Sequence, residues 1–358
     1  MDLDIRRADQ IDPAWLTAAL RNSGALPTGR VGEFSIEPVG NGLVADSFRF
    51  RLTHDGPATA PASIVGKFPS HDPVSRRSGS DHLLYVREVA FYREMAATLA
   101  IHTPRAHAAL IDPATDDFVL LLDDLAPARQ GDQLAGCSLA DARVAMAEAA
   151  ALHAPRWGDL LLPTLDWLAM RPAALGAMVD AMLPAIIALF RERFAGRLVP
   201  EHLAMVEKLP AALIAMRAGM DAPITVQHAD FRLDNMMFDV GGGTRPLATL
   251  DWQTVTAGPG LTDVAYFLSA GISSAERRLH EGELVRFYHA ELLRRGVRDY
   301  GWEACWRDYR RFTLHGILMG VFSALSVERT ERADALFLRM TEGACEQAAD
   351  HDSFGFWV

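Results

Sequence analysis

Apolar and polar residues alternate over short segments in the first third of the chain, and this pattern predicts a small sheet. A strand with one buried face places every second side chain in the core, so a period of two indicates a strand. The segments with strand character are residues 34–39, 47–52, 63–68 and 118–122. The turn Gly40-Asn41-Gly42 separates the first two segments, because glycine and asparagine favour tight turns.

Helical spacing predicts at least two helices in the same region. Asp12 and Pro13 fit the cap and first position of a helix, since aspartate accepts amide hydrogen bonds and proline needs none. Residues 83–99 carry apolar side chains at intervals of three and four, which predicts an amphipathic helix. The first ~125 residues therefore have the order strand, turn, strand, strand, helix, strand, typical of a small α+β lobe.

Beyond residue 127 the composition shifts toward alanine, leucine and methionine, and helices dominate the prediction. Residues 139–153 form a strong helical pattern, and two or three helices follow between residues 163 and 220. We expect these to be broken at the prolines of that region, Pro172, Pro184, Pro200 and Pro210. A short irregular β segment is predicted at residues 224–251, and helices resume at residue 261.

The prediction is thus one small lobe followed by one large helical lobe. The stretch 123–129 is the best boundary, and it gives an N-terminal lobe at residues 1–125 and a C-terminal lobe at residues 126–358. Half of the 358 residues are hydrophobic, which is enough for a sizeable core.

Charge and cysteine usage narrow the class of protein. The formal net charge of −11 argues against a nucleic-acid partner, which usually meets a basic surface. Three widely spaced cysteines argue against a zinc site or a disulfide framework. No apolar signal core opens the sequence and no apolar run is long enough to span a bilayer. We therefore expect a cytoplasmic protein without a membrane partner.

A cluster of polar residues in the β segment carries the candidate chemistry. His228, Ala229 and Asp230 follow an apolar strand segment, Asn235 comes five residues after Asp230, and a second strand ends in Asp251. Phosphoryl transfer needs one carboxylate to hold the acceptor hydroxyl and take its proton, and oxygen ligands to hold Mg²⁺. Asp230 suits the first task, and Asn235 with Asp251 suits the second.

These residues resemble the H-G-D-x-x-x-x-N motif of the aminoglycoside phosphotransferase and choline kinase superfamily, with Ala229 in place of the usual glycine. Leu250-Asp251-Trp252-Gln253 is similar to the metal-binding segment of that family, and the stretch from Gly258 to Leu268 is similar to its G-x-P-x-x-D element. The local sequences around Trp252 and Tyr266 also resemble those of the ecdysteroid-kinase-like branch. The resemblance implies an α+β, two-lobed, protein-kinase-like fold with a small β-rich N-lobe and a large, mainly helical C-lobe. It also implies that Asp263 braces the catalytic loop.

A kinase needs a lysine in the small lobe, and the chain has only Lys67 and Lys208. Lys67 lies in an apolar strand of a sequence that otherwise uses arginine, and a compact ammonium fits between phosphate oxygens. The alternative is a surface lysine at a strand edge. Glu88, in a stretch that resembles the E-x-x-F-Y helix of the family, is the predicted partner of Lys67, although Glu94 is also available.

Further candidates surround the nucleotide. Gly40 and Gly42 lie in the turn that would cover the phosphates with free amides. The segment with Asp123 and Leu125 resembles the family's hinge, whose backbone would bind adenine. His153 lies in a stretch that resembles the family's L-H-A element, and we expect a structural role for it.

The sequence leaves the acceptor open between an aminoglycoside, a choline-like amine, a sugar and a sterol-like alcohol. Residues 310–319 form a helix that could line its site, although its apolar residues also suit a core. The acidic residues near the C-terminus, Glu342, Glu346, Asp350 and Asp352, could attract an amine or form a solvated face. Oligomeric state is not encoded in any pattern.

The predicted function is an ATP- and Mg-dependent phosphotransferase that moves the γ-phosphoryl group to a hydroxyl of a small molecule. Asp230 and His228 are the predicted catalytic residues. Two alternatives remain: a nucleotide-binding scaffold without transfer activity, and a metal-dependent hydrolase with His228 and Asp230 as ligands. A protein kinase is a variant of the first hypothesis, but the H-R-D and D-F-G motifs of protein kinases are missing.

Overall fold

The chain forms two compact units in the computed structural model, which describes residues 3–40, 44–55, 60–168, 173–327 and 329–357. The first unit comprises Met1–Thr98, His102–Ala128 and Asp239–Thr254, and the second comprises Leu99–Ile101, Arg129–Phe238 and Val255–Val358. Each unit is described by itself. The first holds the main sheet and the second is largely helical, so the predicted α+β class is confirmed.

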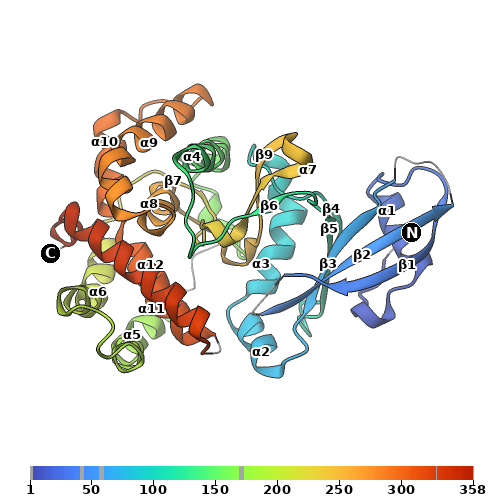
Figure 1. Ribbon diagram of the computed structural model, residues 1–358, viewed down its shortest axis with the longest axis horizontal. Coiled ribbons are helices and arrows are strands. Elements are labelled where there is room, and N and C mark those ends of the chain that lie inside the picture. The colour runs from blue at the N-terminus through green and yellow to red at the C-terminus, as the bar shows by residue number, and fades with distance from the viewer. Residues whose placement is uncertain (1–2, 41–43, 56–59, 169–172, 328, 358) are drawn as a thin grey trace. The chain divides into compact units, whose positions relative to one another are not determined.

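A five-stranded antiparallel sheet in the order β1-β2-β3-β5-β4 forms the centre of the first unit (Figure 1). Its strands are β1 (Arg30–Pro38), β2 (Ala45–Asp55), β3 (Ser63–Pro69), β4 (Ala106–Ile111) and β5 (Phe118–Asp123). The sequence predicted four of them. The fifth, β4, was missed because its sequence Ala-His-Ala-Ala-Leu-Ile has only one β-branched residue and no aromatic residue.

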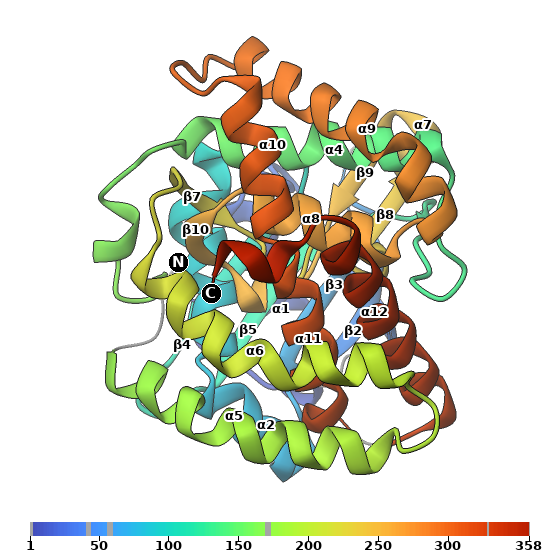
Figure 2. The same ribbon diagram turned by 90° about the vertical axis from the view of Figure 1, so that its left-hand side faces the viewer.

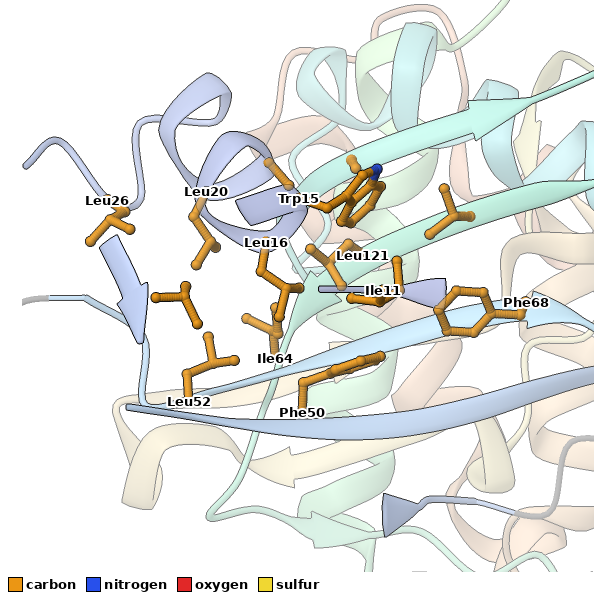
Figure 3. Close-up of a cluster of buried hydrophobic side chains, with 14 residues drawn as sticks. Ile11, Trp15, Leu16, Leu20, Leu26, Phe50, Leu52, Ile64, Phe68 and Leu121 are labelled. Carbon is orange, nitrogen blue, oxygen red and sulfur yellow. The ribbon is translucent and has the colours of Figure 1, made fainter. Parts of the chain in front are cut away.

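One face of this sheet packs against helix α1 (Pro13–Asn22) and forms the core of the unit (Figure 3). Trp15, Leu16 and Leu20 point from the helix toward the sheet residues Phe50 and Ile64, and all five are almost fully buried. The helix begins as predicted, because the side chain of Asp12 accepts the amide of Trp15 at 2.7 Å and Pro13 occupies the first turn.

The helix predicted at residues 83–99 is divided into three pieces. Helix α3 (Leu84–Ala90) continues as a π-helix (Phe91–Met95) and ends in a 3-10 turn (Ala96–Thr98). Helix α2 (Pro73–Asp81) was not predicted, because most of its residues are polar and they form no apolar face. The unit also contains the short helical turn α7 (Val240–Gly243) and strand β9 (Arg245–Thr249), which belong to the segment Asp239–Thr254.

Within its described residues, the second unit contains four short strands and eight helices. One of the strands, β8, continues into the first unit at Asp239. The strands are β6 (Arg129–Gln130), β7 (Ile224–Gln227), β8 (Met236–Asp239) and β10 (Thr256–Pro259); β6 pairs with β8 and β7 with β10, both antiparallel. The helices are α4 (Leu139–His153), α5 (Ala173–Arg193), α6 (Pro200–Ala218), α8 (Leu261–Ala270), α9 (Ser274–Arg294), α10 (Trp302–Arg311), α11 (Leu314–Ser326) and α12 (Glu331–Asp350). Figure 2 shows α5 beside α6 and α11 beside α12.

Two of the predicted helix breaks were wrong. Pro184 lies inside α5 and Pro210 inside α6, and neither interrupts its helix. Pro184 is exposed, so water can bind the carbonyl that loses its amide partner. Pro200 opens α6 at the position where proline is favoured, and Pro172 lies outside the described residues. None of the described helices is long and apolar enough to cross a bilayer.

Candidate active site

Lys67 lies on β3, the central strand of the first unit, and not at a sheet edge. It is paired with Ser47 of β2 on one side and with Leu120 of β5 on the other. Because side chains alternate between the faces of a strand, Ile64 and Phe68 enter the core under α1 while Lys67 points to the opposite face. The alternative of a strand-edge surface lysine is therefore excluded.

The ammonium of Lys67 is held between two carboxylates of the same unit. Both carboxylate oxygens of Glu88, on α3, lie 2.7 Å from Lys67 Nζ, and Asp251 Oδ1 lies 3.5 Å from it. The side chain of Glu88 is 1% exposed, whereas that of Asp251 is 43% exposed. Burial alone would lower the pKa of Lys67, but the charges of Asp251 and Glu88 outweigh it and raise this pKa. Lys67 is therefore a fixed cation. Glu94, the other candidate partner of Lys67, is exposed on the outside of the helix region.

The segment with Asp251 is anchored to the helix that carries Glu88. Trp252 is fully buried and stacks on Phe91, with ring centroids 3.8 Å apart and planes 8° from parallel. Its indole Nε1–H donates to Thr103 Oγ1 at 3.0 Å. Because Phe91 lies three residues after Glu88, one helical region fixes both partners of Lys67. This packing explains why residues 239–254, which the sequence-based division placed in the C-terminal lobe, belong to the first unit.

The other nucleotide candidates lie at the ends of the strands. Gly40 has a φ of +76°, which glycine adopts without strain, and a Cβ there would meet no atom within 4 Å. Gly42 lies outside the described residues. At the end of β5, the amide of Asp123 donates to Arg105 O at 2.9 Å and its carboxylate contacts His107. Leu125 is buried just beyond it.

In the second unit, Asp263 holds the backbone of the loop that carries Asp230. The fully buried carboxylate of Asp263 accepts the amide of His228 at 2.7 Å and that of Ala229 at 2.9 Å. His153 Nε2 lies 3.2 Å from the same carboxylate. Burial raises the pKa of Asp263, but the hydrogen bond and charge of His153 and the charge of His228 outweigh it, so this pKa is lowered.

His228 acts within the protein interior. Its side chain is fully buried, and its Nδ1 accepts the amide of Asp230 at 3.3 Å. A ring without exposed surface has no face to present to a substrate. The predicted catalytic role of His228 is therefore better described as positioning of Asp230.

Three donor groups surround the carboxylate of Asp230. Its Oδ1 accepts Tyr266 OH at 2.9 Å and Arg232 Nε at 3.0 Å, and its Oδ2 accepts Asn235 Nδ2 at 2.8 Å. The same amide nitrogen of Asn235 donates to the carbonyl of Asp230 at 2.9 Å. Because the nitrogen of Asn235 is committed to Asp230, its oxygen is the end that is oriented away and can bind a metal ion.

Sequence reasoning missed the roles of Arg232 and Tyr266. Arg232 bridges Asp230 and Asp234, and the alternation Asp-x-Arg-x-Asp in this loop was the signal available. Tyr266 follows Asp263 by three residues on α8, so both lie on one helix face. Burial and the charge of Asp230 raise the pKa of Tyr266 well above its usual value, which keeps it protonated as a donor. Burial alone would lower the pKa of Arg232, but the negative charge of Asp230 outweighs it and raises this pKa. Arg232 therefore stays cationic.

A second support comes from the segment that precedes α4. The side-chain oxygen of Gln133 accepts the amide of Leu233 at 2.8 Å, and the amide of Gln133 donates to Asp234 at 2.9 Å. Gly131 donates its amide to Met236 O at 2.9 Å. The catalytic loop is therefore fixed on two sides, by Asp263 and by residues 131–133.

Comparison with known proteins identifies the family of this chain. Residues 35–312 match the sequence profile of the Phosphotransferase enzyme family, so the chain belongs to this family. It is therefore a phosphotransferase of the small-molecule kinase class, and the resemblance found in the sequence is confirmed at the family level. Similarity to the ecdysteroid-kinase-like branch stays a prediction. No curated protein matches the sequence.

Solved structures with the same fold are kinases. The ethanolamine kinase of Plasmodium vivax aligns with a TM-score of 0.53 and 10% identity, over 92% of this chain and 87% of that one. The choline kinase of Cryptosporidium parvum aligns with a TM-score of 0.53 and 11% identity, over 90% and 89%. The ADP-bound aminoglycoside phosphotransferase APH(2'')-Ib aligns with a TM-score of 0.50 and 14% identity, over 89% and 95%. At such identities the likeness establishes the kinase-like fold alone.

Proposed function

We propose that the protein transfers the γ-phosphoryl group of ATP, in a Mg-dependent reaction, to a hydroxyl group of a small molecule. The observation that carries the proposal is the ion pair of Lys67 with the buried carboxylate of Glu88, with Asp251 beside it. A fixed cation next to an exposed carboxylate suits a nucleotide with its metal ion, because one binds phosphate and the other binds the metal. Family membership supports the same reaction class.

The side chains fit Mg²⁺ and nucleotide by their chemistry. Mg²⁺ prefers oxygen ligands, and the proposed ligands are the exposed carboxylate of Asp251 and the side-chain oxygen of Asn235. When bound, the metal would neutralise charge on the phosphates. Lys67 would bind the α- and β-phosphates, and the backbone at Gly40 would cover them. The carbonyl of Asp123 and the amide of Leu125 would hydrogen-bond the adenine.

Asp230 is the proposed catalytic residue for the acceptor. Its carboxylate orients the hydroxyl and accepts the proton, while the acceptor oxygen bonds to the γ-phosphorus and the bond to the ADP oxygen breaks. Tyr266, Arg232 and Asn235 hold the carboxylate in one orientation, which lowers the entropic cost of alignment. His228 and Asp263 are positioning residues, because they contact the loop backbone and not its exposed surface.

The hydrolase alternative fits the geometry poorly. It requires His228 as a metal ligand, but the Nδ1 of this ring accepts the amide of Asp230 and the side chain is buried. The scaffold alternative is a protein that binds nucleotide without transfer. It predicts nucleotide binding but no ADP release with any acceptor.

The test is ADP release in the presence of Mg-ATP and a panel of hydroxyl compounds. Asp251→Ala should reduce turnover at least about 1,000-fold through loss of the metal, and Asp230→Asn about 100- to 10,000-fold through loss of the base. Asp299→Ala is the matched control, because Asp299 has a similar positive φ of 59° and is exposed. Near-normal turnover in Asp251→Ala would refute the assignment.

A further inference from the structure

Helix α11 begins beside the proposed catalytic loop. His315, in its first turn, lies with Nε2 2.8 Å from Ala229 O, and since a carbonyl only accepts, Nε2–H is the donor. The ring of His315 meets that of Tyr266 edge-on, with centroids 5.3 Å apart and planes at 87°. Tyr266 in turn donates to Asp230. The start of α11 is therefore one side chain away from the carboxylate of Asp230.

One face of α11 is fixed against α12. A Cβ at Gly316 would lie 2.8 Å from Ala344 Cβ, and a Cβ at Gly320 would lie 2.3 Å from Thr341 Oγ1. The absence of side chains at these two positions lets the helices pack closely (Figure 2). This contact determines which residues of α11 can turn away from α12.

A second face of α11 carries His315, Met319 and Phe322, which we call the acceptor stripe. These residues recur at i, i+4 and i+7, so they share one side of the helix, and all three stay partly exposed within the chain. At 1.5 Å of rise per residue the stripe is about 10 Å long. It leads from the loop of Asp230 along the helix.

The helix that carries the stripe offers no carboxylate to a cation. Helix α11, Leu314–Ser326, contains no Asp, Glu, Lys or Arg at all. Asp234 is paired with Arg232, and Asp132 with Arg332. Burial lowers the pKa of His315 below its usual 6.5, so this residue is neutral at pH 7.

Of the four acidic residues near the C-terminus, two are engaged in ion pairs. Glu346 and Asp350 are both ion-paired with Arg278, and Asp350 also contacts Arg277. The family match ends at residue 312, just before α11 begins. The stripe therefore lies outside the matched part of the chain, where a feature particular to this protein is expected.

We infer that the acceptor is a neutral alcohol with an apolar body that lies along the acceptor stripe and presents its hydroxyl to Asp230. The inference rests on the proposed function and names its substrate class. A quaternary amine or a polycationic aminoglycoside would lose hydration on this helix without gaining a carboxylate partner, which is unfavourable. An apolar chain gains free energy there by burial of both surfaces.

The test compares kcat/KM for two groups of acceptors with Mg-ATP in excess. The apolar group is the series of primary alcohols from 1-butanol to 1-octanol, and the cationic group is choline, ethanolamine and gentamicin. We expect kcat/KM to rise about fourfold per added methylene, as burial of each methylene predicts. A flat series, or a cationic acceptor with higher kcat/KM than 1-octanol, would overturn the inference.

Substitutions on the helix complete the test. Phe322→Asp and Phe322→Ala should both reduce kcat/KM for 1-octanol, at least tenfold for the charged variant, and flatten the chain-length series. Ile214→Asp on α6 is the matched control, since Ile214 is a 53% exposed apolar residue of another helix. Stabilisation by Mg-ATP shows that each variant is folded. Unchanged kinetics in both Phe322 variants would contradict the inference, whereas loss of Mg-ATP stabilisation in the wild type would contradict the proposed function itself.

Discussion

At the scale of single residues, the departure from the family motif at Ala229 falls on a strained backbone position in the loop of Asp230. Ala229 has a φ of +62°, a left-handed conformation that glycine adopts freely and that costs other residues about 1–2 kcal/mol. The motif has glycine at this position, and this chain retains the same backbone with alanine. The strain is maintained by Asp263, which accepts the amide of Ala229, and by His315, which donates to its carbonyl.

Ala229→Gly should therefore stabilise the protein. Relief of about 1–2 kcal/mol of strain exceeds the entropic cost of glycine, about 0.5–1 kcal/mol, so we expect a net gain of about 0.5–1 kcal/mol in the free energy of unfolding. Urea denaturation measures this change in the free energy of unfolding. Ala188→Gly, at an exposed interior position of α5, is the control and should destabilise by about 1 kcal/mol. Equal losses in both variants would show that Ala229 is unstrained.

Asp263 gives a prediction for pH. Its pKa is lowered in the folded protein, so its contribution to stability is fully present above the unfolded value of 3.8 and is lost as pH falls through the lower folded pKa. Asp263→Asn should destabilise by about 2–4 kcal/mol at pH 5–8, since a buried acceptor of several hydrogen bonds is lost.

Urea denaturation of wild type and Asp263→Asn from pH 3 to pH 8 tests this account. The difference between them should be constant above pH 5 and shrink below about pH 4, where the carboxylate of Asp263 in the unfolded wild-type chain begins to take up a proton. Asp9→Asn serves as control, because Asp9 is 72% exposed and should show no such difference. A difference that grows toward low pH would contradict the assigned direction.

The sequence alone predicted which residues carry the candidate chemistry, but it did not predict the contacts between these residues. The order of Asp230, Asn235 and Asp251 was visible as a motif, and Lys67 stood out because lysine is rare in this chain. The contacts of Tyr266, Gln133 and His315 with the catalytic loop join segments that lie 36, 100 and 86 residues from their partners. No local pattern encodes such separations.

At the scale of elements, the close approach of two loops depends on one glycine. A Cβ at Gly131 would lie 2.2 Å from Leu233 O, which is backbone and cannot move aside without moving the loop of Asp230. Strand β6 meets β8 at this point, so residues 129–133 form one wall of the catalytic loop. The strand is only two residues long, which is why its pairing was not predicted.

Gly131→Ala should displace the catalytic loop. We expect destabilisation by about 1–3 kcal/mol and a fall in kcat of about 100-fold, since a shift of about 1 Å can cost that factor. Binding of Mg-ATP, measured by calorimetry, should be much less affected than kcat. Gly282→Ala on α9 is the control: no atom lies within 4 Å of a Cβ there, so stability should rise by about 0.5–1 kcal/mol with kcat unchanged. A normal kcat in Gly131→Ala would show that this wall does not position the loop.

The elements that the sequence predicted best are those with a clear period. Helix α4 was predicted with its bounds at residues 139 and 153. In the structure, Ser138 caps its start and accepts the amide of Asp141 at 3.1 Å. The helix expected at residues 310–319 is instead the end of α10 and the start of α11. The apolar pattern continues across this break, so periodicity could not locate it.

At the scale of the whole molecule, the division into two compact units does not follow the order of the sequence. Lys67, Glu88 and Asp251 belong to the first unit, and Asp230 and Asn235 belong to the second. The segment Asp239–Thr254 leaves the second unit, joins the first and returns, so the chain carries Asp251 into the unit that holds Lys67. The sequence analysis divided the chain once, near residue 125. The composition of residues 239–254 does not change in a way that would indicate that this segment joins the first unit.

The most direct test of the central claim is the effect of Mg-ATP on the melting temperature of wild type, Asp251→Ala, Lys67→Ala and the control Lys208→Ala. A ligand that binds only the folded state stabilises it, by about 4 kcal/mol at 1,000 times its Kd. We predict a Mg-dependent rise of several degrees in wild type and Lys208→Ala, and its loss in the two site variants. No rise at saturating Mg-ATP, or an equal rise in all four proteins, would contradict a nucleotide site built on Lys67 and Asp251.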